Sequence, residues 1–323
     1  MRHLFHFSNG TFDFRPDKRC FVAGDDAGRG VNCGHPYLES TLTAVESQEM
    51  HARVQIQLDL LLARPWLLLD CLPARLQPVG REISQYFQQM FTDEETRAYV
   101  IFALSMCLTG NNEVAHLLNG RGCNGKTDFL EKLLPLLFGD YHCTMGAQLW
   151  TSPAPASKFL TASLKDKRCA TAELSASTTK AKVVLREHAV KAFVGNTDVA
   201  IQAREPYSRT VQVFVSQFAS FLSTNNNVQP ENDSLRHRLR YIPLFTHFYP
   251  HMPMRRSDGS LFGFPQFRRD ATLPERMRAW PVPLLWLLVQ AQLLLPNGKL
   301  PDVSETRFAQ VFHFTERKFA ELT

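Results

Sequence analysis

The spacing of hydrophobic residues divides the chain into a hairpin, a helical stretch and a stretch in which strands and helices alternate. In FHFSNGTFDF, phenylalanines alternate on both sides of an Asn-Gly pair, which predicts a β-hairpin. Helical periodicity follows over about 40–62 and again over 79–108. In FTDEETRAYVIFALSMCLTG we expect Thr92 to cap a helix and Gly110 to end it.

From about Glu113 the pattern changes to alternating strands and helices. The expected order is a strand EVAHLLN, a glycine-rich loop, a helix over about 126–137, a strand RCATAEL, a helix, a strand pair and a strand VFVSQFASFLSTN. This alternation is typical of an α/β sheet covered by helices. After Pro250 the chain is basic and irregular before two apolar helical stretches close it.

The stretch LLNGRGCNGKTDFLEKLL places three of the chain's 16 glycines within six residues. Its pattern, Gly120-x-x-x-x-Gly125-Lys126-Thr127, has the spacing of a phosphate-binding loop. Glycines let successive N–H groups point at phosphate oxygens, and the following helix presents its positive end to the same anion. Lysine then reaches the outer phosphates and threonine ligates Mg²⁺. A glycine turn without a ligand is the alternative.

The flanks of this loop favour the phosphate-binding interpretation. A strand should precede the loop and an amphipathic helix should follow it. The helix is predicted to bury one stripe of apolar residues, namely Phe129, Leu130, Leu133, Leu134 and Leu137.

ATP hydrolysis also needs a carboxylate beside Mg²⁺ and a polar group near the γ-phosphate. Glu173 ends the apolar run KRCATAEL, and Asn225 follows the apolar strand FASFLST. An amide there can hydrogen-bond both water and phosphate. A surface glutamate and an asparagine-rich turn are the alternatives.

The segment DSLRHRLRYIPLF places three arginines at alternate positions, Arg236, Arg238 and Arg240. The planar, permanently charged guanidinium suits contact with a transition-state phosphate across a subunit boundary. A solvated basic edge is the alternative interpretation.

Composition narrows these interpretations only slightly. The 36 basic and 31 acidic residues give a net charge of +5, which permits nucleic-acid contact without requiring it. Seven scattered cysteines contain no C-x-x-C pair, which argues against a zinc site and favours a reducing compartment. The leucine-rich stretches LDLLLARPWLLLDCL and WPVPLLWLLVQAQLLL are too short and too interrupted to span a bilayer, so we expect buried helices and no membrane partner.

These motifs, in this order, resemble the superfamily 3 helicases of viruses, phages and plasmids, in particular the C-terminal half of poxvirus-type and phage/plasmid-type primase–helicases. FSNGTFDF resembles the opening element of that family, GRGCNGKT its phosphate loop, KRCATAEL its single-glutamate acidic strand, STNNN its asparagine motif and RHRLRYIPLF its arginine segment.

The resemblance implies an AAA+ P-loop ATPase core at 96–250, a mostly helical N-terminal domain at 1–95 and a C-terminal helical lid within 251–323. Lys126, Glu173, Asn225 and Arg238 would be catalytic, with Arg236 the alternative to Arg238. ATP would be held by the loop residues Gly120, Arg121, Gly122, Cys123, Asn124, Gly125, Lys126 and Thr127, and Mg²⁺ by Thr127 and Glu173.

The resemblance further implies a hexameric ring that binds ATP between copies and moves along single-stranded DNA at a forked duplex. A hairpin within about 199–217 would contact the strand through Arg204 and Arg209. The chain has no room for the primase domain that often precedes this module, so we expect either a separately encoded primase, as a candidate partner, or a chain that is itself a fragment. We expect an intracellular protein, in the nucleus or cytoplasm of a host. A P-loop kinase, or a ring NTPase that binds nucleic acid without unwinding it, is the rival function.

Overall fold

The computed structural model describes residues 3–24, 31–120, 122–154, 158–175, 182–195, 199–226, 228–251, 263–295 and 300. Arg121 of the phosphate loop and most of the predicted lid beyond Leu295 lie outside these residues.

The first residues form the expected hairpin. β1 (Leu4–Phe7) pairs antiparallel with β2 (Gly10–Asp13), and β3 (Cys20–Ala23) extends the sheet on the other side of β2. The four alternating phenylalanines are buried, so this face of the hairpin joins the core. The hairpin prediction is confirmed.

Three helices follow the hairpin, α1 (Ala44–Leu61), α2 (Gln77–Met90) and α3 (Glu94–Thr109). The expected cap at Thr92 is wrong by one residue. Asp93 caps α3, because its carboxylate accepts the Thr96 N–H at 2.8 Å. Gly110 ends the helix as expected, with a left-handed φ of 65°.

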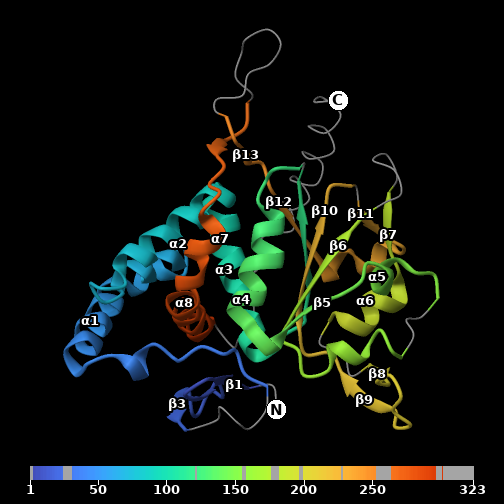
Figure 1. Ribbon diagram of the computed structural model, residues 1–323, viewed down its shortest axis with the longest axis horizontal. Helices are drawn as coiled ribbons and strands as arrows, with labels where there is room; N and C mark the ends of the chain where they lie inside the picture. Colours follow the sequence, from blue (N-terminus) through green and yellow to red (C-terminus); the bar gives the residue numbers. More distant parts are fainter. Residues whose placement is uncertain are drawn as a thin grey trace.

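A five-stranded sheet forms the centre of the molecule (Figure 1). Its spatial order is β12 (Leu239–Pro243), β4 (Ala115–Asn119), β10 (Ala219–Thr224), β6 (Cys169–Leu174) and β5 (His142–Thr144). All neighbouring pairs are parallel, so every strand ends at the same edge. The chain is therefore α/β with a parallel central sheet, as the alternation predicted.

Smaller elements surround this sheet. The prediction of a single strand over VFVSQFASFLSTN is wrong. This segment forms two strands, β9 (Gln212–Val215) and β10, which are separated by Ser216–Phe218. The paired short strands are β7 (Val183–Leu185) with β11 (Val228–Pro230), β8 (Ala200–Ala203) with β9 (Gln212–Val215), and β13 (His247–Tyr249) with β14 (Gln266–Arg268). The remaining α-helices are α4 (Leu134–Phe138), α5 (Gln148–Thr151), α6 (Glu187–Phe193), α7 (Leu273–Arg276) and α8 (Pro281–Leu294).

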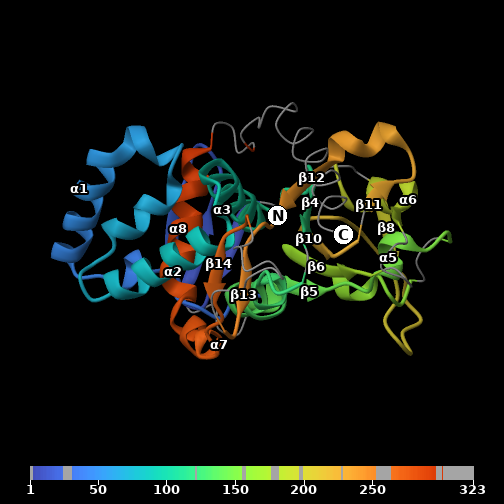
Figure 2. The ribbon, with the colours of Figure 1, turned by 90° about the horizontal axis from the view of Figure 1, so that it is seen from above.

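Helices cover both faces of the central sheet (Figure 2). Side chains of adjacent residues on a strand point to opposite faces. Accordingly, Leu118 and Phe221 belong to one buried cluster with α2, α3, α4 and α8, whereas Leu117 and Leu222 belong to another with α5 and α6.

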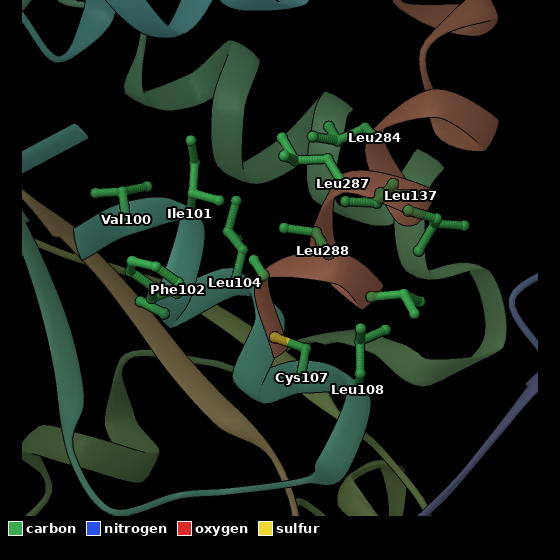
Figure 3. Packing of buried hydrophobic residues seen from close by; sticks show 14 of the residues in the cluster. Val100, Ile101, Phe102, Leu104, Cys107, Leu108, Leu137, Leu284, Leu287 and Leu288 are labelled. Atoms are coloured by element: carbon green, nitrogen blue, oxygen red, sulfur yellow. The ribbon is translucent and has the colours of Figure 1, made fainter. Parts of the chain in front are cut away.

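The first cluster contains the leucine-rich C-terminal helix. Leu284, Leu287 and Leu288 of α8 pack near Ile101 and Leu104 of α3 (Figure 3). The other leucine-rich stretch continues from α1 into a tight 3₁₀ turn at Pro65–Cys71, since proline restricts the backbone there. Within the described ranges, no helix combines the length and apolarity needed to cross a membrane.

Candidate functional site

The glycine-rich loop leaves the carboxyl end of β4 and enters a helical segment over 126–138. Its first turns are π-helical over Asp128–Leu133, and the N–H of Leu134 bonds to the carbonyl of Phe129. This wide turn precedes Pro135, which cannot donate a backbone hydrogen bond. The expected apolar stripe is buried, so the helix is fixed against the core and positions the loop.

Two glycines of the loop are required by their surroundings. A Cβ on Gly120 would overlap the side-chain amide of Asn124 and lie 2.7 Å from the carbonyl oxygen of Leu244. Gly125 has a left-handed φ of 83°, and a Cβ there would lie 3.3 Å from the ring of Phe248. A Cβ on Gly122, by contrast, would meet no atom within 4 Å.

The loop is also held from outside. The N–H of Phe248 donates to the carbonyl of Cys123 at 2.6 Å, which ties β13 to the loop. Cys123 is exposed and has a φ of 63°, an uncommon conformation for a residue with a side chain. The loop therefore holds backbone strain at the position where a ligand would approach.

Lys126 lies within a ring of oxygen atoms and is 8% exposed. Its ammonium donates to the carbonyl of Gly120 at 2.6 Å, to Oδ1 of Asn225 at 2.7 Å and to Oδ1 of Asn124 at 3.0 Å. Burial lowers the pKa of Lys126 to about 8, and the Glu173 carboxylate acts in the opposite direction. The lysine is thus a desolvated cation at the centre of the loop.

Three more predicted residues lie around the phosphate loop, and two of them come from other strands. Glu173 is the exposed residue of an otherwise buried β6, and it lies opposite Ser223 of β10 in the strand register. Asn225 directly follows β10, and Thr127 lies on the first turn after the loop. Because β10 runs between β4 and β6, the strand order itself brings the amide between the loop and the carboxylate.

The residues fit Mg²⁺ bound together with a polyphosphate. The Glu173 carboxylate and the Thr127 hydroxyl offer oxygen ligands within one cavity. No group of three or more acidic, histidine or cysteine side chains able to hold a metal exists in the part of the chain that the structure describes. Two protein oxygens suit Mg²⁺, which takes its other ligands from phosphate and water.

The loop residues from Gly122 to Thr127, together with Glu173 and Asn225, line one open cavity of about 360 Å³, which is within the usual size of a small-molecule site, whereas Gly120 does not line it. The cavity is also lined by residues that the sequence patterns did not indicate. They come from α2, from β13, from the residues after β14 and from α7, and they are Tyr86, Phe248, Arg269, Asp270 and Leu273. The cavity lies at the carboxyl edge of the sheet, where ligands of open α/β sheets bind.

The arginine segment lies away from this cavity. Arg238 is half-buried and donates through Nη1 to the carbonyl of Val194 at 2.8 Å. Arg236 is exposed and forms an ion pair with Asp233 at 3.0 Å. Within the described chain, neither arginine lines the cavity, so a role in it would require a second copy.

The predicted hairpin is present as β8 and β9, and it joins β10 at the amino-terminal edge of the sheet. Figure 1 shows it at the end of the molecule opposite to β13. Arg204 directly follows β8 at the start of the hairpin loop, where its guanidinium covers the ring of Phe159 at 4.7 Å. Arg209 is exposed near the tip, beside the fully exposed Tyr207. Sequence reasoning did not single out Tyr207, because a lone aromatic in a polar loop carries no periodic signal.

Comparison with known proteins gives one curated relative. The chain is 28% identical over 216 residues to a protein named "Putative helicase L207/L206" from Acanthamoeba polyphaga mimivirus. The match covers 65% of this chain and 22% of that protein, so the chain corresponds to about a fifth of its relative. No family profile matches the chain.

Solved structures resemble the chain more distantly. An apo form of the NrS-1 C-terminal region matches 71% of this chain and 50% of its own length, at 14% identity and a TM-score of 0.46. JCV helicase, in complex with a thiazolopyridine compound, matches 86% of this chain and 70% of its own, at 14% identity and a TM-score of 0.38.

Proposed function

We propose that the chain is an ATP-dependent DNA helicase subunit of superfamily 3, with an AAA+ core, that serves replication of a virus or mobile element. One observation carries the nucleotide part of this proposal. A phosphate-type loop, a buried lysine, a carboxylate and an amide from three parallel strands line one cavity. The helicase name of the mimivirus relative supports the nucleic-acid part.

In this proposal each residue has a defined task. The loop N–H groups and Lys126 hold the phosphates, and Thr127 and Glu173 would hold Mg²⁺, which neutralises developing charge when bound. Glu173 also polarises the attacking water, and Asn225 positions it. Because Asn225 already accepts from Lys126, phosphate and amide would share the same ammonium.

A neighbouring copy in the proposed hexameric ring would supply a further positive charge to the site. We propose that Arg238 of a neighbouring copy stabilises the transition state, with Arg236 as the alternative. In a hexamer, the β8–β9 hairpin would face the central channel and contact single-stranded DNA through Arg209 and Arg204 of its connecting loop. Contact would be mainly to phosphates and therefore insensitive to sequence and weakened by salt. A primase on a separate chain remains a candidate partner.

The test is ATP hydrolysis with and without single-stranded DNA, read beside strand displacement on a forked duplex. We expect single-stranded DNA to stimulate hydrolysis and the fork to be unwound. Lys126→Ala should abolish turnover, and Glu173→Gln should bind ATP without hydrolysing it. An ATP hydrolysis rate that does not change with DNA would favour a kinase-type enzyme. Hydrolysis that DNA stimulates, without strand displacement on the fork, would favour a nucleic-acid-binding NTPase. Unchanged hydrolysis in Lys126→Ala would refute the site.

A further inference from the structure

One side chain of the cavity is buried, polar and unpaired. Tyr86 of α2 is 6% exposed and lines the cavity, yet its hydroxyl makes no hydrogen bond within the described residues. An unsatisfied buried hydroxyl is destabilising, so natural proteins rarely keep one without a reason. The hydroxyl is therefore a candidate for contact with a ligand that enters the cavity.

The position of this hydroxyl is fixed by its neighbours. The Tyr86 ring packs against Trp280 at 5.2 Å and edge-on against Phe87 at 5.8 Å. The Trp280 indole donates to Glu82 at 2.9 Å, one turn before Tyr86 on α2. Glu82 also pairs with Arg276 of α7. These contacts leave the ring beside the cavity little freedom to reorient.

The lining of the cavity combines two kinds of chemistry. The phosphate loop provides a cation and backbone N–H groups, and Leu130, Leu273 and Phe248 provide apolar surface. A ligand that matches both carries several negative charges and a flat, largely apolar group with polar edges. Nucleoside polyphosphates have this combination, and a tyrosine hydroxyl can either donate to or accept from a base edge.

We propose that Tyr86 is a specificity-determining residue that hydrogen-bonds the nucleobase of a bound nucleoside polyphosphate. This inference rests on the proposed nucleotide site and adds its recognition of the nucleoside. Burial raises the pKa of Tyr86, with the nearby Asp128 acting in the same direction, so the hydroxyl stays protonated as a donor. Because Tyr86 belongs to α2, the nucleoside would contact a helix outside the central sheet.

Titration calorimetry with two probes tests the proposal, using ADP with Mg²⁺ and inorganic tripolyphosphate with Mg²⁺. Tyr86→Phe removes only the hydroxyl and keeps the ring. We expect this variant to bind ADP about three- to tenfold more weakly and tripolyphosphate equally well. Its thermal stability without ligand should be unchanged or higher, because a buried unpaired group has been removed.

Tyr99→Phe is the matched control. Its hydroxyl is buried but lies 3.2 Å from Nδ1 of His116, outside the cavity. It should lose stability and keep its affinity for ADP. Unchanged ADP affinity in Tyr86→Phe would overturn the proposal, and so would an equal loss for both probes, which would indicate an effect through the loop. Binding of neither probe would overturn the phosphate site as well.

Discussion

Nucleotide affinity should fall as the pH rises above 8, because of Lys126. Burial lowers the pKa of this ammonium from an ordinary 10.5 to about 8. A polyphosphate against Nζ favours the charged form and would restore the higher pKa. Above pH 8 the free protein has lost the proton, so binding must take one up and becomes less favourable.

The magnitude follows from linkage for one proton. Each pH unit above the pKa of the free protein reduces the affinity by a limiting factor of about ten, or roughly 1.4 kcal/mol. With a pKa of about 8 in the free protein, the protonated fraction falls about tenfold between pH 7 and pH 9. We therefore expect ADP to bind about tenfold more weakly at pH 9 than at pH 7.

Titration calorimetry in two buffers of different ionisation enthalpy measures both the affinity and the protons taken up. Uptake should rise from near zero at pH 7 toward one per site at pH 9. Lys126→Arg keeps its charge over this range and should give a flat profile if it binds.

Lys126→Arg identifies the source of the pH dependence. If the dependence persists in this variant, a group other than the lysine causes it. Constant ADP affinity from pH 7 to pH 9 in the unaltered protein, without proton uptake, would refute the reasoning about Lys126.

Three further predictions concern stability and can be measured by urea unfolding. Gly125→Ala should lower the free energy of unfolding by about 1–2 kcal/mol, because Gly125 has a left-handed φ. Gly122 has open space around it, so Gly122→Ala should change this free energy by less than about 0.5 kcal/mol. Equal effects of the two substitutions would contradict this reasoning. Burial lowers the pKa of His116 to about 3, so the unfolded state binds more protons below pH 6.5; this histidine should contribute about 2 kcal/mol to the stability lost from pH 7 to pH 5, and His116→Gln should lose less over that range by about this amount. Leu287→Ala, in the core of α8, should lose about 2–5 kcal/mol, while the exposed Val213→Ala should lose less than about 0.5 kcal/mol.

The parts of the fold that depend on local patterns could be predicted from the sequence. The phosphate-loop spacing specifies backbone angles and a following helix within a dozen residues. The run of small and apolar residues before Glu173 indicates a buried strand, and the glutamate breaks that pattern where the strand meets the cavity. In each case the physical cause lies within the segment itself.

Other features depend on contacts between distant segments. Tyr86 belongs to a helix whose periodicity indicates an ordinary core position, and only the packing of α2 beside the phosphate loop brings this side chain to the cavity. The position of β10 between β4 and β6 likewise follows from the sheet and not from chain order. The prediction of the α3 cap was wrong by one residue for a simpler reason. Thr92 and Asp93 are both favourable N-cap residues, and the helix begins after the second of them.

The structure separates the two arginine candidates by how firmly each is positioned. Arg238 is half-buried, its Nη1 donates to the Val194 carbonyl, and a Cβ on Gly195 would lie 2.7 Å from that nitrogen. This contact uses one of five guanidinium donors and leaves the others available in a fixed orientation. Arg236 has an exposed pair with Asp233 three residues earlier, a contact of little energy. Stabilising a transition state requires a charge that is already oriented, which favours Arg238.

Mixing subunits tests this assignment. Neither Lys126→Ala nor Arg238→Ala alone should hydrolyse ATP, but a mixture should recover part of the activity, because some interfaces join an intact loop to an intact arginine. Arg236→Ala should remain active alone. Arg238→Ala should also lose about 1 kcal/mol of stability through the bond to Val194, so unfolding curves must show that it is folded under assay conditions. An inactive Arg236→Ala beside an active Arg238→Ala would reverse the assignment. A monomer that hydrolyses ATP at full rate would remove any need for an arginine from a second copy.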